Sequence, residues 1–187
     1  MTEKKQMRNV AVYLGAGNPL MPEFRQAVTD LAVYLAEHRM TLIFGGSNCG
    51  MMKLLADTVL RHGGEAVGIF TKCLPEKLIR DDLSGSVISE NLAARKAEML
   101  KRADAAIALP GSLGTFDELF DALAQCKLGM VKIPIGVLNI NGFFDPLFEL
   151  LRNSVRAGFT RPDIADLLQS GRTPEELFRN LQSRLQE

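Results

Sequence analysis

The sequence predicts an α/β protein in which one parallel sheet is covered by helices on both faces. Short apolar runs typical of buried strands alternate throughout the chain with segments whose apolar residues recur at helical spacing. In addition, glycine-bearing turns follow several of the predicted strands. In a sheet of this class the loops beyond the carboxyl ends of the strands are where ligands bind, so these turns are the first places to look for a function.

The first half of the chain contains three predicted strands and two predicted helices. The strands are short apolar runs at residues 9–15, 41–46 and 65–70. Between them, apolar residues repeat at helical spacing through residues 24–38, with Phe24 and Val28 on one face. A second helix is predicted over residues 51–61, and it is closed by the glycine pair that follows.

The second half continues the alternation and ends in a helix. Strands are predicted at residues 87–89, 104–110 and 133–140, and helices at residues 91–103, 116–128 and 144–157. The last helix opens at Thr173, which is a good N-cap, with Pro174 in the first turn and Glu176 completing a capping box.

Composition restricts the classes of protein. The 187 residues suffice for one sizeable core, and 22 basic and 22 acidic residues give a net charge of zero. We therefore expect one domain over residues 1–187, without binding to nucleic acid or membrane. No apolar run approaches the ~18 residues of a spanning helix. Residues 1–8 are expected to form a solvated, flexible tail, and the protein is expected to be cytoplasmic.

The cysteines and histidines do not indicate a metal centre. Cys49, Cys73 and Cys126 are odd in number and widely spaced, which fits neither a disulfide framework nor a zinc site. Cys49 lies in a glycine-rich turn, and its interpretation as a small packing residue is favoured over the alternative of a reactive thiol. His38 and His62 lie at the ends of predicted helices, where a cation suits the helix dipole. No metal ion or cofactor is expected.

The turn after the first strand is only a partial dinucleotide fingerprint. Gly15 and Gly17 match the first two glycines of G-x-G-x-x-G, but Leu20 stands at the third. An NAD-dependent oxidoreductase is therefore the weakest of the functions considered.

The turn PGSLGT combines several features that suit a phosphate group. Gly111, Ser112 and Gly114 allow backbone N–H groups to converge, and a helix starts directly afterwards. Thr115 adds a hydroxyl donor. The structural alternative is a capping box, because Thr115 and Glu118 have the T-x-x-E spacing.

Arg95 and Lys96 lie in a predicted helix just before that strand. The simple interpretation is a solvated face. However, Arg95 and Met99 are four residues apart and share a face, so Arg95 can instead lie at the edge of the apolar side, opposite a carboxylate and a phosphate turn.

These residues resemble the LOG ("Lonely guy") family, the cytokinin riboside 5′-monophosphate phosphoribohydrolases, which were formerly described as possible lysine decarboxylases. The family hallmark P-G-G-x-G-T-x-x-E reads PGSLGTFDE here, and the R-K pair before it is Arg95-Lys96. VYLGAG, FGGSNCGMM and LNINGFFDPL resemble three further family segments. No lysine lies in a recognisable cofactor-binding context, so decarboxylation finds no support in the sequence.

The resemblance implies a Rossmann-like, three-layer, doubly wound homodimer. The implied reaction is hydrolysis of the N-glycosidic bond of an adenine-type nucleoside 5′-monophosphate, as in an AMP nucleosidase, to free base and ribose 5-phosphate. The family's catalytic residues fall on Arg95 and Glu118. Its phosphate-binding turn falls on Gly111, Ser112, Gly114 and Thr115, with Lys96 beside Arg95, and its second glycine turn falls on Gly45 and Gly46.

Some positions differ from the family pattern. Ser112 replaces the second hallmark glycine: it is strained if that position needs a positive φ, and adds a donor if it does not. Ser47 and Lys53 also replace glycines, and no histidine precedes Arg95. The base can therefore differ from a cytokinin. The alternative function is a non-catalytic carrier of a nucleotide or of molybdenum cofactor, built on the same fold.

Overall fold

Seven strands form one parallel sheet in the order β4-β3-β2-β1-β5-β6-β7. The structure is a computed structural model and describes residues 6–73, 75 and 78–185. The strands are β1 (Asn9–Tyr13), β2 (Thr41–Phe44), β3 (Ala66–Thr71), β4 (Gly85–Ser89), β5 (Ala105–Ala108), β6 (Ile135–Leu138) and β7 (Leu168–Gly171). The inner strands are almost wholly buried, which explains their continuous apolar sequence and confirms the predicted sheet.

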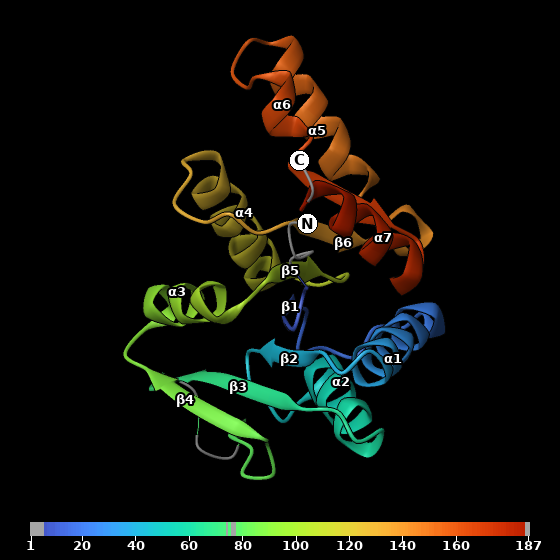
Figure 1. Ribbon diagram of the computed structural model, residues 1–187, viewed down its shortest axis with the longest axis vertical. Coiled ribbons are helices and arrows are strands. Elements are labelled where there is room, and N and C mark those ends of the chain that lie inside the picture. The colour runs from blue at the N-terminus through green and yellow to red at the C-terminus, as the bar shows by residue number, and fades with distance from the viewer. Residues whose placement is uncertain (1–5, 74, 76–77, 186–187) are drawn as a thin grey trace, which may run out of the picture.

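Helices cover both faces of the sheet, as Figure 1 shows. One face carries α1 (Pro22–Glu37), α2 (Gly50–Arg61) and α7 (Pro174–Arg184). The other carries α3 (Leu92–Arg102), α4 (Leu113–Lys127) and α5 (Asp145–Arg156). A 3₁₀ turn η2 (Ile140–Gly142) precedes α5, and a short helix α6 (Pro162–Ala165) follows it. Each layer of helices has its own apolar core against the sheet, so the architecture is the Rossmann-like three-layer fold that was predicted.

The order of the strands places a crevice between β1 and β5. From β1 the chain moves outward through β2 and β3 to β4, and it then returns to β5 on the opposite side of β1. Tyr13 at the end of β1 is in register with Ala108 at the end of β5, so the turns that follow these strands lie next to each other. Ligands of doubly wound sheets bind at such a switch point, beyond the carboxyl ends of the strands.

Local signals account for the helix starts. Asn91 accepts a hydrogen bond from the Ala94 N–H at 2.9 Å and so caps α3. Thr173 accepts one from the Glu176 N–H at 3.3 Å, while the Glu176 carboxylate accepts one from the Arg172 N–H at 2.8 Å. The predicted start of the last helix is therefore confirmed.

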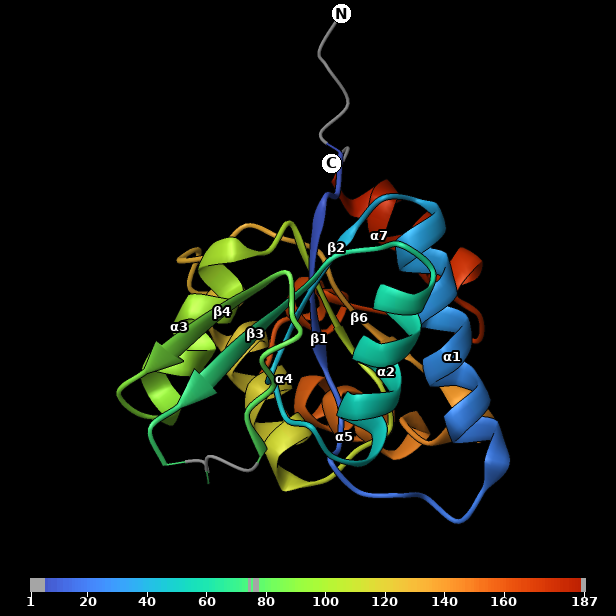
Figure 2. The ribbon, with the colours of Figure 1, turned by 90° about the horizontal axis from the view of Figure 1, so that it is seen from below.

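Four features differ from the sequence predictions. Helix α4 begins at Leu113, three residues earlier than expected, and β7 and α6 were not predicted. The expected tail lies outside the described residues up to residue 5, but its extension to residue 8 is wrong, because Met7 is only 4% exposed. Figures 1 and 2 show that the two described ends of the chain lie close together.

A buried arginine ties the segment before β4 to α2. The side chain of Arg80 is 3% exposed and contacts Asp57 at 2.7 Å and Asp82 at 2.6 Å. Since a buried guanidinium needs compensating charge, these two carboxylates allow it to be buried.

The interpretation of Cys49 as a packing residue is wrong, since this cysteine is exposed. Cys73 is also exposed, and Cys126 is half-buried. His38 and His62 are at the ends of α1 and α2, as expected. Among the described residues, no helix has the length and apolar character needed to cross a membrane.

Candidate active site

A buried ion pair joins α3 to α4. Arg95 Nη1 donates to Glu118 Oε1 at 2.9 Å, and Arg95 Nε donates to the carbonyl oxygen of Ile69 in β3 at 2.8 Å. Arg95 is 8% exposed and Glu118 is 6% exposed. The structure therefore brings together the two residues that the sequence analysis singled out, and it places Arg95 on the inward side of its helix rather than on a solvated face.

Gly45 makes room for the guanidinium. A Cβ atom at this position would lie 1.8 Å from Arg95 Nη2, so any larger residue after β2 would displace the arginine. The glycine turn after β2 thus serves the ion pair directly. This steric requirement explains why position 45 is a glycine.

The environment of Glu118 changes its acidity. Burial raises the pKa of Glu118 to about 7, although the charge of Arg95 opposes this rise. The carboxyl group therefore exchanges its proton near neutral pH, as suits an acid–base group. Tyr13 at the end of β1 is also buried on this face, and burial, followed by the charge of Glu118, raises the pKa of its phenol above the usual range.

The turn before α4 offers unpartnered donors. Ser112 is the N-cap of α4, but its side chain makes no capping hydrogen bond. Among the described residues, the N–H groups of Gly111 and Ser112 have no hydrogen-bond acceptor. Thr115 Oγ1 is buried and likewise has no partner within the described chain. Free N–H groups, a helix N-terminus and a free hydroxyl make this turn suitable for an anion.

The structure also decides two alternatives that the sequence left open. The capping box at Thr115 and Glu118 is not formed, because Thr115 lies inside α4 and Glu118 pairs with Arg95. Ser112 has φ −117°, so the serine at this hallmark position is not strained.

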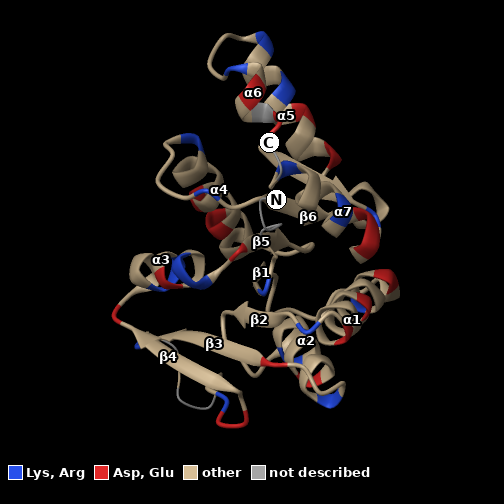
Figure 3. Ribbon diagram, viewed as in Figure 1, with Lys and Arg blue, Asp and Glu red and all other residues tan. Residues whose placement is uncertain are grey.

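The other predicted site residues have simpler surroundings. Gly114 lies in the first turn of α4 with open space around its α-carbon, and Gly46 has φ +75° against the ring of Phe70. Lys96 contacts Asp117 at 2.8 Å and Asp121 at 3.7 Å, so it bridges α3 and α4 beside the buried pair. Figure 3 shows the basic residues of α3 next to the acidic ones of α4.

Sequence reasoning missed two contributors to this site. The Ile69 carbonyl is a backbone group, and no residue pattern indicates which carbonyl a buried arginine contacts. Tyr13 had a weak signal, since a tyrosine at the end of a buried strand places its hydroxyl near the carboxyl edge. Within the described chain, no group of three or more His, Cys, Asp or Glu side chains is placed to hold a metal ion.

Fold and site together define a Rossmann-like α/β protein with a glycine-bearing turn at a helix start and a buried Arg–Glu pair. Residues 52–181 match the protein family described as "possible lysine decarboxylase". Cytokinin riboside 5′-monophosphate phosphoribohydrolase LOG5 of Arabidopsis thaliana is 33% identical over 181 residues, which cover 96% of this chain and 79% of that protein. Cytokinin riboside 5′-monophosphate phosphoribohydrolase LOG of Oryza sativa subsp. japonica is 32% identical over 180 residues, covering 96% and 74%. The chain belongs to the LOG family.

Solved structures share the fold at lower identity. The molybdenum cofactor binding protein from Rippkaea orientalis superposes with a TM-score of 0.71 at 21% identity, covering 95% of this chain and 97% of that one. The Moco carrier protein from Chlamydomonas reinhardtii has a TM-score of 0.69 at 19% identity, covering 97% and 99%. These likenesses support the architecture of the sheet and helices.

Proposed function

We propose that the protein hydrolyses the N-glycosidic bond of nucleoside 5′-monophosphates, AMP or a cytokinin riboside monophosphate, to free base and ribose 5-phosphate. The observation that carries the proposal is the buried ion pair between Arg95 on α3 and Glu118 on α4. Glu118 thus lies on the helix whose uncapped start offers an anion site. The relatives with this function in their names, at 31–33% identity, support the same reaction.

The 5′-phosphate is proposed to bind the turn before α4. The N–H groups of Gly111 and Ser112 and the hydroxyl of Thr115 are free to donate to its oxygens, and the helix dipole favours its negative charge. Glu118 lies six residues after Ser112, about 9 Å further along the helix at ~1.5 Å per residue. Phosphate anchoring on α4 would therefore direct the ribose toward the carboxylate.

Glu118 is proposed to act on C1′ of the ribose. As the C1′–N bond breaks, the electron pair leaves with the base and positive charge develops on the sugar. An ionised Glu118 stabilises that charge, and either attacks C1′ or removes a proton from the water that does so. The water supplies the new C1′ hydroxyl and the base takes up a proton. Arg95 orients the carboxylate through the 2.9 Å contact and is a positioning residue in this scheme.

A homodimer is proposed as the working form. The chain's own core buries Leu119, Met99 and Leu100. However, Phe120 on α4 is 43% exposed and Leu92 on α3 is 57% exposed. Apolar side chains therefore remain on the outer side of the two helices that carry the ion pair, where a second copy can cover them. The partners proposed are thus the nucleotide and a second copy, in the cytoplasm.

The second candidate is a non-catalytic carrier of a nucleotide or of molybdenum cofactor. The solved structures with this fold that are described as Moco carriers support it. A carrier needs the phosphate turn but not a carboxylate that titrates near neutral pH, and this difference favours the enzyme.

The decisive experiment is incubation of the protein with AMP and, separately, with adenosine. Free adenine and ribose 5-phosphate should form from AMP far faster than adenine forms from adenosine, because the phosphate supplies binding energy for the reaction at C1′. Binding of AMP without release of adenine would favour the carrier. Equal rates on AMP and adenosine would contradict the proposal that the turn before α4 binds the 5′-phosphate.

A further inference from the structure

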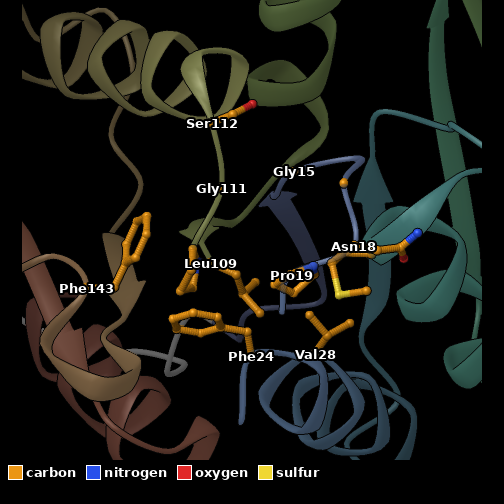
Figure 4. Close-up of a pocket in the computed structure, with 12 residues that line it drawn as sticks. Gly15, Asn18, Pro19, Phe24, Val28, Leu109, Gly111, Ser112 and Phe143 are labelled. Atoms are coloured by element: carbon orange, nitrogen blue, oxygen red, sulfur yellow. The ribbon is translucent and has the colours of Figure 1, made fainter. Parts of the chain in front are cut away.

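A cavity lies at the carboxyl edge of the sheet, where the turns after β1 and β5 meet α1. Its volume is about 290 Å³. Phe24 and Val28 of α1, Met51 of α2, Leu109 and Phe143 supply most of its wall, as Figure 4 shows in part. Since this cavity lies against α1, it is called the α1 pocket below.

The α1 pocket is electrically neutral. No acidic or basic residue lines it, and Asn18 and Ser112 are the only lining residues with polar side chains. In Figure 4 the Asn18 amide and the Ser112 hydroxyl point away from the apolar side chains that enclose the cavity. A cation placed here would lose its hydration without gaining a partner. An anion would find donors only in the Gly111 and Ser112 N–H groups, which are assigned to the phosphate, so the apolar part of the pocket suits an uncharged ligand.

The shape of the pocket suits a planar ring. Phe24 and Phe143 contribute two rings with centroids 5.9 Å apart and an interplanar angle of 80°, so a ligand ring can meet one of them face-on and the other edge-on. Pro19 and Pro110 add flat walls without flexible side chains. Aromatic pairs of these geometries are favoured beyond the burial of their area.

The α1 pocket is separated from the ion pair by the edge of the sheet. Leu109 and Met51 belong to the core under α1 and α2, whereas Arg95 and Glu118 lie on α3 and α4 over the opposite face. At the edge itself the two turns touch, since a Cβ atom on Gly15 would lie only 3.4 Å from the α-carbon of Gly111. The α1 pocket thus borders the phosphate turn at Gly111 and Ser112, whereas neither residue of the ion pair lines it.

We propose that the α1 pocket binds an uncharged planar heteroaromatic molecule, of the chemistry of a free nucleobase, as a second ligand beside the nucleotide. The base that the proposed reaction releases has this chemistry. The site does not depend on hydrolysis, however, because its wall contains neither Arg95 nor Glu118.

Binding of benzimidazole and of adenine, measured by saturation-transfer NMR, tests the proposal. Both should bind the unaltered protein, whereas benzylammonium, a ring that carries a positive charge, should bind much more weakly, because no acidic residue lines the pocket. Val28→Phe fills the cavity and should abolish binding. Arg25→Phe is the matched control, because it adds the same ring at an exposed position of the same helix and should leave binding unchanged.

Phe24→Leu covers the case in which Val28→Phe does not fold. It removes one ring wall and keeps an apolar side chain, and it should weaken benzimidazole binding about two- to tenfold. Glu118→Gln should leave ring binding unchanged. No binding to the unaltered protein, or binding that is lost in Glu118→Gln but kept in Val28→Phe, would overturn the proposal.

Steady-state kinetics with AMP show whether the α1 pocket takes a second ligand or the base of the nucleotide itself. If the α1 pocket holds a second ligand, Val28→Phe should leave the KM for AMP within about twofold of its value in the Arg25→Phe control, a change below ~0.5 kcal/mol by the relation of free energy to affinity. A large rise in the KM would mean that the pocket takes the base of the nucleotide itself, and the proposal would be wrong. If the protein releases no adenine from AMP, the proposed hydrolysis fails while the NMR result still stands.

Discussion

Arg95 Nη1 lies 2.9 Å from Glu118 Oε1, in a contact that is almost completely removed from solvent and that connects α3 to α4. A buried ion pair of this kind is weak evidence for stability, because the loss of hydration of both charges offsets their attraction. Arg95 is held by β3 and by the space at Gly45 as well, so α4, β3 and the turn after β2 converge on one guanidinium. This convergence is the basis of the predictions that follow.

Glu118→Gln should lower the release of ribose 5-phosphate by at least about a hundredfold, since it keeps the shape of the side chain and removes its acid–base function. Thermal stability should change little, because the pKa of Glu118 is about 7 and much of the carboxyl is already protonated at neutral pH. Asp117→Asn is the control: this neighbour is exposed and contacts Lys96, and activity should stay within about twofold, because exposed ion pairs contribute little. Near-normal turnover in Glu118→Gln would rule out its catalytic role.

The pH profile should have its main limb near pH 7. Burial raises the pKa of Glu118 to about 7, and the proposed reaction needs the ionised form, so kcat/KM for AMP should increase through this pH and level off above it. The limb should disappear in Glu118→Gln. A rate that instead falls as the pH rises through 7 would mean that the protonated acid is the active form.

The same titration should affect folding stability in the opposite direction. A carboxyl whose pKa is raised by the fold contributes stability that is fully present below its ordinary value of 4.5 and lost as pH rises through about 7. Urea unfolding followed between pH 4 and pH 8 should show this loss in the unaltered protein and not in Glu118→Gln. Identical pH dependence in both proteins would contradict it.

Gly45→Ala should damage the site through Arg95. The added methyl group would lie 1.8 Å from Nη2 and must displace the guanidinium. We expect activity to fall at least about tenfold and stability to fall by about 1–3 kcal/mol, as for overpacking elsewhere. Gly85→Ala is the matched control, since a methyl group there would meet its nearest neighbour, in Val67, at an ordinary 3.6 Å. Equal effects of the two changes in steady-state kinetics and urea unfolding would contradict a specific role for Gly45.

Two buried threonines provide an internal comparison for the phosphate turn. Thr115 and Thr58 both have hydroxyl groups without a partner among the described residues. Thr115→Val should raise the KM for AMP and reduce the preference for AMP over adenosine, by about 10–150-fold for the loss of one hydrogen bond to a charged group. Thr58→Val should leave both unchanged, and neither change should lower the melting temperature. A KM for AMP unaffected by Thr115→Val would remove this hydroxyl from the phosphate site.

Assembly should depend on the exposed side of α4. Phe120→Asp places a charge on the proposed dimer surface and should give a folded monomer of 20.6 kDa with little activity. Phe159→Asp, at an 84% exposed position after α5, is the comparison and should remain dimeric. Light scattering distinguishes the two forms. A fully active monomer in the unaltered protein would contradict the proposal.

Much of this architecture could be predicted because strand and helix periods are strong in the sequence. The runs that became β1, β2 and β5 are short and apolar, and they could only be buried strands between helices. Strand β7 was missed, since LQSG has polar residues and lies at the edge of the sheet, where half-burial weakens the apolar signal. The early start of α4 was missed because Gly114 is a poor helix former, so the sequence did not indicate a helix at this position.

The candidate site was predicted in part. Arg95 and Glu118 could be named from sequence, but whether the threonine capped a helix or stood free could not, because T-x-x-E spacing is compatible with both. The contact between Gly45 and Arg95 joins residues fifty positions apart, and no local pattern encodes it. The exposure of Cys49 was also mispredicted, since it depends on how the turn after β2 packs.

The nearness of the two described chain ends has a practical consequence. The two ends lie where β1 enters the sheet, at the edge opposite to the one that carries the glycine turns, and Met7 and Leu185 both belong to the core under α1, α2 and α7. A short peptide joining the ends would disturb neither the crevice nor the helices around it, and new ends could be opened in an exposed loop elsewhere. Circular permutation, or attachment to a sensor surface through either end, should therefore leave the nucleotide side of the molecule facing solution.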